Sequence, residues 1–211
     1  MPVKVSASQV KELREMTGAG PLDCKKALEE NGGDVEKAAN YLREKGIAKA
    51  QKKLGKGRNM NEGIVEVYQH FNGRLAVIAE VNCETDFVAN TEQFKAFAKD
   101  IVLHISSMKP LYIRREEVPE ADVQHERDIQ MKQPDLEGKP DNIKEKIADG
   151  RMNKWFQEIV LLEQEFLKDD SKTIQQLLEE TVAEVGESIQ ISRFSRFELG
   201  GGDAEEEGDE E

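Results

Sequence analysis

Two segments of alternating residues, joined by an Asn-Gly pair, constrain the fold of this chain most strongly. Residues 64–71 and 74–83 alternate with a period of two, which is typical of strands with one face turned to a core. Asn72-Gly73 is a preferred pair for a two-residue type I′ turn. We therefore predict a β-hairpin closed by this turn.

Apolar residues at helical spacing follow the hairpin. They predict a helix over residues 94–105 that starts at Asn90 or Thr91, where Asn90 and Gln93 would form a capping box. Pro119 is expected to open a second helix running to about residue 133. Residues 143–160 suggest one helix, or a pair interrupted near Gly150.

The chain's last regular elements are a helix and a strand. Ser171 is expected to cap the helix. Residues 189–199 alternate as a strand with Ile189, Ile191, Phe197 and Leu199 on one face and Phe194 on the other. Strands at both ends of the region, with helices between them, predict an α+β fold in which a small antiparallel sheet is covered by helices on one side.

The first 47 residues predict a separate bundle of three short helices. Ser6 and Gln9 form a capping box before the first helix, Pro21 suits the first position of the second, and Asp34 caps a third that would end at Gly46. We expect a basic linker over residues 48–62, because five Lys and Arg lie between 49 and 58 without one acid. The core would then span 63–199, and a tail 200–211.

A large apolar residue, Phe87, lies between the predicted strand and the next helix, outside the apolar stripe of either. One interpretation is a hydrophobic staple, in which Phe87 or Val88 packs on the first turn of that helix. The other is that a rigid strand-turn-helix presents Asp86 and Phe87 to a partner, because regular elements position functional residues on the connections between them.

Several separated motifs resemble one protein family. Residues 82–88 read Asn-Cys-Glu-Thr-Asp-Phe-Val, residues 17–20 read Thr-Gly-Ala-Gly and residues 23–28 read Asp-Cys-Lys-Lys-Ala-Leu. Together with Gly-Arg-Met at 150–152 and the segment 194–199, they resemble elongation factor Ts in its short form, from about residue 6 to residue 199. That family is the nucleotide exchange factor of the translational GTPase elongation factor Tu.

The resemblance implies two contact sites on the GTPase. Four residues would wedge beside the phosphate and Mg²⁺ site of GDP-bound elongation factor Tu and promote GDP release: Thr85, Asp86, Phe87 and Val88. The family also docks a ubiquitin-associated-like three-helix module, here residues 1–47, through positions that match Leu22 and Lys25. Pro21-Leu22 stands where methionines are common in the family, which keeps the apolar character of this contact.

Charge is distributed unevenly along the chain. The formal net charge is -13, but seven acids lie in the last nine residues, which predicts a disordered acidic tail. The basic segment 49–58 contains no aromatic residue on which a base could stack, so we expect no direct nucleic-acid contact. A cationic surface that steers the module toward an acidic protein fits the family better.

Other features indicate a soluble cytoplasmic protein. No apolar run approaches the length that spans a bilayer, and the first residues resemble neither a secretion signal nor a transit peptide. Cys24 and Cys83 lie on separate predicted elements without a CxxC pattern or a nearby histidine. We expect reduced core thiols and no metal site.

The sequence shows no pattern of covalent catalysis. It has no Gly-rich phosphate loop, nucleophile elbow or HExxH motif, and His70, His104 and His125 lack motif spacing. We therefore expect a nucleotide exchange factor that needs no cofactor and is not an enzyme in the covalent sense. The main alternative is a non-catalytic dimeric module that binds a helix or a nascent chain; a nucleic-acid-binding protein is a weaker one.

Apolar residues on both faces of the last strand predict an uncovered patch on the sheet. Short members of the family, which this chain resembles, pair with a copy of themselves. We therefore expect a homodimer through the core sheet, and a 2:2 assembly with the GTPase would follow from it. The last strand contains no cysteine, so such a dimer would need no disulfide there.

Overall fold

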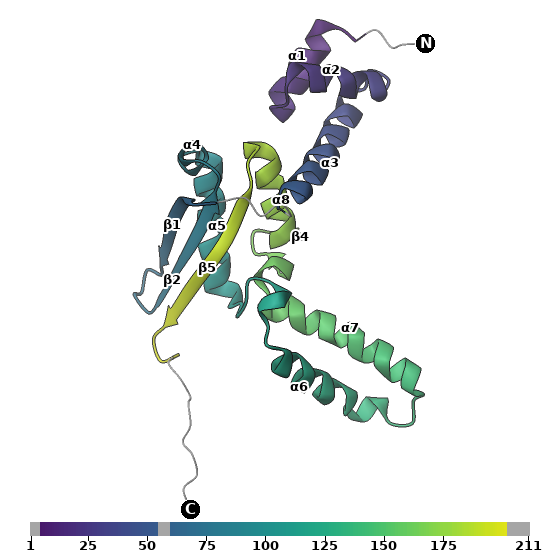
Figure 1. Cartoon of the computed structure of the whole chain (residues 1–211), viewed down its shortest axis with the longest axis vertical. Coiled ribbons are helices and arrows are strands. Elements are labelled where there is room, and N and C mark those ends of the chain that lie inside the picture. Colours follow the sequence, from purple (N-terminus) through teal and green to yellow (C-terminus); the bar gives the residue numbers. More distant parts are fainter. Residues whose placement is uncertain (1–4, 55–59, 202–211) are drawn as a thin grey trace, which may run out of the picture.

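The computed structural model describes residues 5–54 and 60–201. In Figure 1 the N-terminal helices lie at one end of the molecule, a sheet is backed by helices, and α6 (Glu120–Met131) and α7 (Asp141–Ile159) project together from the core. The α+β class predicted from the sequence is confirmed. None of the helices in the described ranges combines the length with the apolar character that a membrane span requires.

The N-terminal bundle consists of α1 (Ala7–Thr17), α2 (Pro21–Glu30) and α3 (Val35–Leu54). The predicted capping box is present: the Ser6 hydroxyl accepts from the Gln9 N–H, and the Gln9 side chain accepts from the Ser6 N–H. Five residues form the buried core of the bundle: Leu13, Cys24, Ala27, Leu28 and Ala38. This bundle has its own core, separate from that of the sheet.

The predicted end of the third helix at Gly46 is wrong, because α3 continues to Leu54. The first residues of the expected linker, 48–54, are therefore helical, and residues 55–59 lie outside the described part of the chain. Gly46 has a packing role instead. A Cβ there would lie 3.3 Å from the Cβ of Ala183, so the glycine lets α3 approach α8 (Ile174–Val185) closely.

The sheet contains three antiparallel strands in the order β1-β2-β5. They are β1 (Glu62–Gln69), β2 (Leu75–Cys83) and β5 (Ile189–Glu198). The predicted hairpin pairs β1 with β2, for example Val67 with Ile78, and is confirmed. Positions facing the helices are buried on the central strand β2, such as Val77, Ala79 and Val81.

The turn of this hairpin differs from the predicted type I′ pair. The His70 N–H donates to the Leu75 carbonyl and the Gly73 N–H to the His70 carbonyl, which leaves residues 71–74 as a four-residue loop. Gly73 has a φ of 68°, but Asn72 has a negative φ, whereas a type I′ turn needs positive φ at both central residues. The Asn72 side chain instead accepts the Arg74 N–H.

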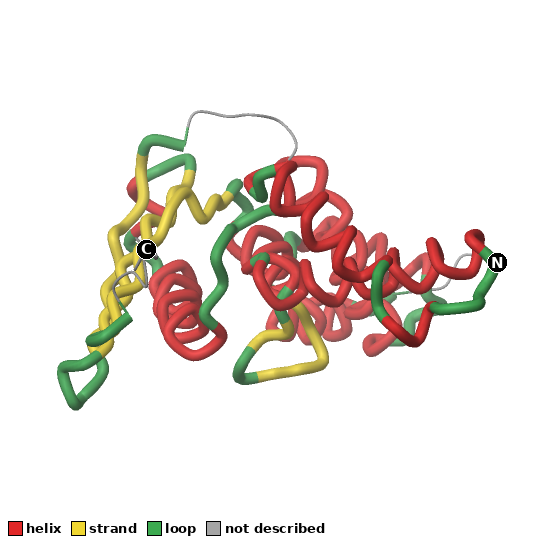
Figure 2. Tube along the Cα trace, turned by 90° about the horizontal axis from the view of Figure 1, so that it is seen from below, coloured by secondary structure: helices red, strands yellow, loops and turns green. Residues whose placement is uncertain are grey.

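Helices cover one face of the sheet, as predicted (Figure 2). The long helix α5 (Glu92–Met108) packs on β1 and β2, and its buried residues include Phe94, Phe97 and Ile101. Helix α8 packs beside α5 through Ile174, Leu178 and Val182. The core of the domain therefore lies between the sheet and these two helices.

The helix pair α6 and α7 projects from the core and is joined to it by a short connection at each end. It is preceded by η1 (Arg115–Glu117), interrupted by η2 (Pro134–Leu136) and followed by η3 (Leu161–Glu163). Helix α7 runs without a break through Gly150, so of the two expected alternatives the single helix is confirmed. Nothing lies within 4 Å of a Cβ at Gly150, so this glycine marks no close contact.

A second small hairpin, β3 (Glu165–Phe166) and β4 (Asp169–Thr173), comes before α8 and was not predicted. Ser171 lies within β4, so the expected helix cap at Ser171 is wrong. Thr173 caps α8 instead, in a capping box with Gln176. Both residues offer a hydroxyl, and the hairpin decides which one reaches the helix.

A β-bulge changes the faces of β5. Val81 pairs with Ile191 and Glu80 with Arg193, so Ser192 is an extra residue. Ile189 and Ile191 are buried before the bulge, but after it Phe194 faces the core. The predicted grouping of Phe197 and Leu199 with the two isoleucines is therefore wrong, and both side chains are exposed.

Candidate functional site

The connection after β2 forms a short helix, α4 (Asp86–Ala89), that carries an exposed aromatic ring. Thr85 caps it, because its hydroxyl accepts the Val88 N–H at 3.4 Å. The Phe87 side chain is 82% exposed. We call residues 85–88 the tip. Figure 1 shows α4 at one end of the sheet.

Helix α5 begins after its N-cap Thr91, which is one of the two start positions expected from the sequence. The predicted capping box between Asn90 and Gln93 is wrong: the Thr91 hydroxyl accepts the Phe94 N–H, and Asn90 is the C-cap of α4. The extra turn of helix was missed because four residues are too few to show helical periodicity. It places Phe87 on a helix rather than in an open turn.

The four tip residues differ in burial: Thr85 is half-buried, Val88 is buried, and Asp86 and Phe87 are exposed. Val88 is 8% exposed and belongs to the core below the sheet, together with Ala89. Asp86 and Phe87 face solvent. The staple interpretation therefore fits Val88 and excludes Phe87, whose ring is left available to a partner.

Two glutamates hold the tip against the rest of the core. The Thr85 hydroxyl donates to the Glu187 carboxylate at 2.9 Å, and the Thr85 N–H donates to it at 3.1 Å. The Ser188 N–H donates to Glu84 at 2.9 Å. Sequence reasoning missed Glu187, since nothing in the sequence brings together residues 102 positions apart.

Cys83 lies buried beneath the tip. Its thiol contacts the Thr85 carbonyl at 3.1 Å, and burial raises the pKa of this thiol. Cys24 is also buried and unpaired in the described structure. Both thiols therefore pack in cores, as expected.

The other predicted contact residues lie on α2, in the N-terminal bundle. Leu22 is 77% exposed on the first turn of α2. Lys25 is exposed one turn later and forms an ion pair with Glu29 at 3.8 Å. Figure 1 shows α2 and α4 well apart, so the structure presents two separate surfaces rather than one pocket.

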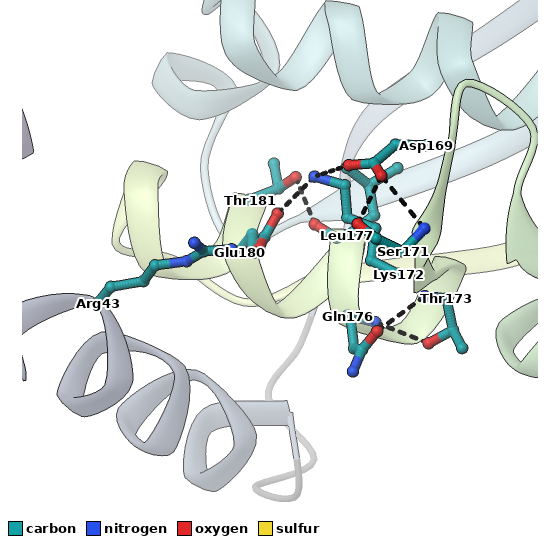
Figure 3. A network of polar contacts seen from close by, with 9 residues as sticks. All are labelled: Arg43, Asp169, Ser171, Lys172, Thr173, Gln176, Leu177, Glu180 and Thr181. Carbon is teal, nitrogen blue, oxygen red and sulfur yellow. Dashed lines mark hydrogen bonds and ion pairs between the residues drawn. The ribbon is translucent and has the colours of Figure 1, made fainter. Parts of the chain in front are cut away.

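Helices α3 and α8 join the bundle to the core through a polar network (Figure 3). Arg43 of α3 forms an ion pair with Glu180 of α8, and Lys172 contacts the same carboxylate at 2.9 Å. Burial raises the pKa of Glu180, but the hydrogen bonds from Lys172 and Arg43 outweigh it and hold this pKa below its ordinary value. Lys172 also reaches Asp169 at 3.5 Å.

The face of the sheet opposite the helices is partly apolar. The exposed large apolar side chains on this outer face are those of Val65, Val67, Ile78 and Phe197. Val67 pairs with Ile78 across β1 and β2, and Ala76 next to it pairs with Phe197 across β2 and β5. The patch therefore spans all three strands.

Elsewhere, the described residues contain no group of three or more His, Cys, Asp and Glu side chains placed to hold a metal ion. His70 contacts the Tyr68 hydroxyl at 2.8 Å near the hairpin loop. His104 is fully buried and contacts Gln164 at 2.9 Å. These contacts satisfy the two histidines structurally.

Comparison with known proteins agrees with this arrangement. The family model described as "Elongation factor TS" matches residues 7–201. The chain is 53% identical to elongation factor Ts of Carboxydothermus hydrogenoformans over 97% of this chain and 94% of that protein. It is 54% identical to elongation factor Ts of Desulfitobacterium hafniense over 94% and 91% of the two chains. The chain therefore belongs to the elongation factor Ts family.

Proposed function

We propose that this chain accelerates the release of GDP from elongation factor Tu during translation elongation in the cytoplasm. It would bind both the GDP-bound and the nucleotide-free GTPase, without a cofactor and without contacting nucleic acid. The observation that carries the proposal is the Phe87 ring, 82% exposed on a helix whose neighbouring residues are anchored. Family membership supplies the partner.

The tip would act as a wedge. GTPases hold GDP through backbone N–H groups around its phosphates, a lysine, and Mg²⁺ that bridges protein and phosphate oxygens. Phe87 would enter a gap between helices beside this site and displace the elements that hold Mg²⁺. Asp86 would compete for hydrogen bonds or charge there. Thr85 and Val88 would anchor the wedge from below, since one is hydrogen-bonded and the other is buried.

The free energy gained by burying the Phe87 ring limits how far the wedge alone can accelerate GDP release. Burying one Phe ring contributes about 1.5–3 kcal/mol, and about 1.4 kcal/mol changes a rate roughly tenfold. Phe87 alone would therefore supply about a tenfold to hundredfold acceleration. A larger effect requires binding energy from a second contact.

The N-terminal module, residues 1–47, would supply that second contact through Leu22 and Lys25. Leu22 offers an exposed apolar side chain. The ion pair between Lys25 and Glu29 is exposed and within one helix, so it contributes little and Lys25 remains available to an acid on the partner. The linker and core assignments, 48–62 and 63–199, are part of the same proposal; of the acidic tail, residues 202–211 lie outside the described part.

We also propose that the apolar outer face of the sheet pairs with a second copy of this chain. Val65, Val67, Ile78 and Phe197 are exposed there on adjacent strands. A contiguous apolar patch on a soluble protein marks an interaction site. Each chain keeps its tip at the end of the sheet, so a dimer could carry two GTPases in a 2:2 assembly.

Release of a fluorescent GDP analogue from elongation factor Tu tests the proposal. In excess unlabelled GDP, catalytic amounts of this chain should accelerate release over many turnovers. Because coupling is reciprocal, GDP should also weaken the chain's affinity for the GTPase by the factor by which the chain weakens GDP binding. Binding without any dependence on nucleotide would instead support a non-catalytic binding module.

A further inference from the structure

We propose that Glu187 is a positioning residue for nucleotide exchange: its carboxylate sets the orientation of the tip and therefore of the Phe87 ring. This inference rests on the proposed function, which makes Phe87 the group that enters the GTPase. Glu187 itself would contact neither GDP nor the reacting site. It would act through Thr85, which it holds from the far end of α8.

The Thr85 hydroxyl has two roles that depend on each other. It donates its hydrogen to the Glu187 carboxylate, with 2.9 Å and 3.0 Å to the two oxygens. It also accepts the Val88 N–H at 3.4 Å, which is the N-cap of α4. With its hydrogen directed to Glu187, the hydroxyl keeps a lone pair for Val88. The carboxylate therefore supports the cap that starts the helix carrying Phe87.

Hydrogen bonds run in both directions between the end of β2 and the start of β5. The Thr85 N–H donates to Glu187, while the Ser188 N–H donates to Glu84. We call these contacts of Thr85 and Ser188 with the two glutamates the clasp. They continue the β2-β5 pairing beyond its last backbone pair, Cys83 with Ile189. Side-chain carboxylates thus tie the tip to β5 where the backbone ladder has ended.

The charge of Glu187 has no competing partner among the described residues. Among the described residues, no lysine or arginine forms an ion pair with Glu187. Its side-chain hydrogen bonds in these residues run to Thr85. Hydrogen bonds to an ionised carboxylate are stronger than those between neutral groups. This is the arrangement expected of a side chain whose role is to hold Thr85.

Helix α8 explains how Glu187 reaches the tip. Gly186 ends the helix with a φ of 78°, and its N–H donates to the Val182 carbonyl. The next residue, Glu187, then meets Thr85. The same helix carries Glu180 and Ala183, which contact α3 of the N-terminal module. One helix therefore anchors both surfaces that we propose to contact the GTPase.

The tip needs such a restraint because α4 has only four residues. An isolated helix of this length is not stable in water. Without Glu187, Phe87 would sample many orientations, and ordering it in the transition state for GDP release would slow that step. Docking through Leu22 and Lys25 would change little, since these residues lie on α2.

The test compares Glu187→Ala and Glu187→Gln with Glu184→Gln, which removes a charge from an exposed site on α8. Exchange is measured against increasing concentrations of each variant, corrected for its folded fraction. We expect Glu187→Ala to lower the maximal rate about tenfold, with the half-saturating concentration nearly unchanged. Glu187→Gln should lose clearly less than Glu187→Ala, because its amide oxygen still accepts from Thr85, although without the extra strength that the charge gives.

Three results would overturn the proposal. Glu187→Ala could exchange as fast as the wild type, its loss could follow the folded fraction alone, or Glu187→Gln could lose as much as Glu187→Ala. The last result would show that charge, and not hydrogen bonding to Thr85, matters. A structural role alone would leave the maximal rate per folded molecule unchanged.

A second measurement separates this proposal from the proposed function. Amide hydrogen exchange at Thr85 and Val88 needs no GTPase, and we expect it to become about tenfold faster in Glu187→Ala than in Glu184→Gln. If the wild type fails to accelerate GDP release while these amides respond as expected, the proposed function fails but the clasp stands. Unchanged amide protection would remove the clasp whatever the exchange activity.

Discussion

Gly46 of α3 lies so close to Ala183 of α8 that a Cβ on residue 46 would be 3.3 Å from the Ala183 Cβ. This contact, with the ion pair between Arg43 and Glu180, joins the N-terminal bundle to the core. The separation between Leu22 and Phe87 is therefore set by the packing of two helices.

We expect Gly46→Leu to separate α3 from α8, because the larger side chain has no room there. Forcing extra methylene groups into a packed contact costs about 1–3 kcal/mol. Small-angle X-ray scattering should show a larger radius of gyration, and exchange should slow. Gly150→Leu is the matched control, since nothing lies within 4 Å of a Cβ at that helical glycine. Unchanged dimensions in Gly46→Leu would contradict the expectation.

Gly150→Ala should stabilise the protein. Gly150 lies inside α7, has no positive φ and has open space around its Cα. Alanine in a helix interior is more favourable than glycine by about 0.5–1 kcal/mol. Urea unfolding of both proteins measures the difference. A lower midpoint for the variant would show that α7 requires a glycine for a reason that its packing does not reveal.

Local signals in the sequence predicted much of the fold. The capping box at Ser6, the alternation of the hairpin strands and the stripe of α5 each depend on residues a few positions apart. These predictions are confirmed, because the tertiary contacts at these places favour the same structure as the local preferences do. The failures at Gly46 and Ser171 have the opposite cause: contact with α8 in one case, and a second hairpin in the other, overrides the local preference.

The candidate site was predictable only in part. Phe87 belonged to no apolar stripe, which left a packed staple and a partner-facing ring as alternatives; the structure, in which the ring is 82% exposed, decides between them. Glu187 had no comparable signal, because one acid among many becomes a partner of Thr85 only when β5 pairs with β2. The bulge at Ser192, which turns Phe197 outward, likewise depends on pairing between strands.

Phe87→Ala should slow exchange about tenfold to hundredfold, from the energy of burying one ring. Its melting temperature should stay unchanged, because the ring makes little contact with the fold. Phe71→Ala is the control: that ring is 94% exposed on the hairpin loop, and we expect exchange at the wild-type rate. If stability fell together with activity, Phe87 would belong to the fold and the wedge would be wrong.

His104 should make stability depend on pH. Burial lowers the pKa of this histidine, which accepts the Leu167 N–H at 3.2 Å through Nδ1 and contacts Gln164 through Nε2. The unfolded chain therefore binds a proton more readily than the folded one. The contribution of His104 to the free energy of unfolding is complete above its unfolded pKa of about 6.5. This contribution is lost as the pH falls below that value.

Urea unfolding between about pH 5 and pH 7 measures this effect. Wild-type stability should rise with pH more steeply than that of His104→Gln, which has no group to titrate at this position. The same change at His125, which is exposed, provides the control. Equal slopes for the wild type and His104→Gln would show that other groups account for the pH dependence.

Val67→Glu tests the proposed dimer. Val67 lies on the edge strand β1, opposite Ile78 on the exposed outer face, where a charge cannot be buried against a second copy without large cost. Light scattering at micromolar concentration should give the mass of two chains for the wild type and of one chain for the variant. Leu111→Glu, at an exposed apolar site outside the strands of the sheet, should remain dimeric. A monomeric wild type would remove the proposal.

The monomeric variant would also show whether each chain acts alone. The tip, Glu187 and the α3-α8 contact all come from one chain. Exchange per mole of Val67→Glu should therefore equal that of the wild type, provided that the fold is intact by circular dichroism. A loss of exchange in a folded monomer would mean that the partner chain completes the contact with the GTPase, and the 2:2 assembly would then be a requirement rather than a consequence of dimerisation.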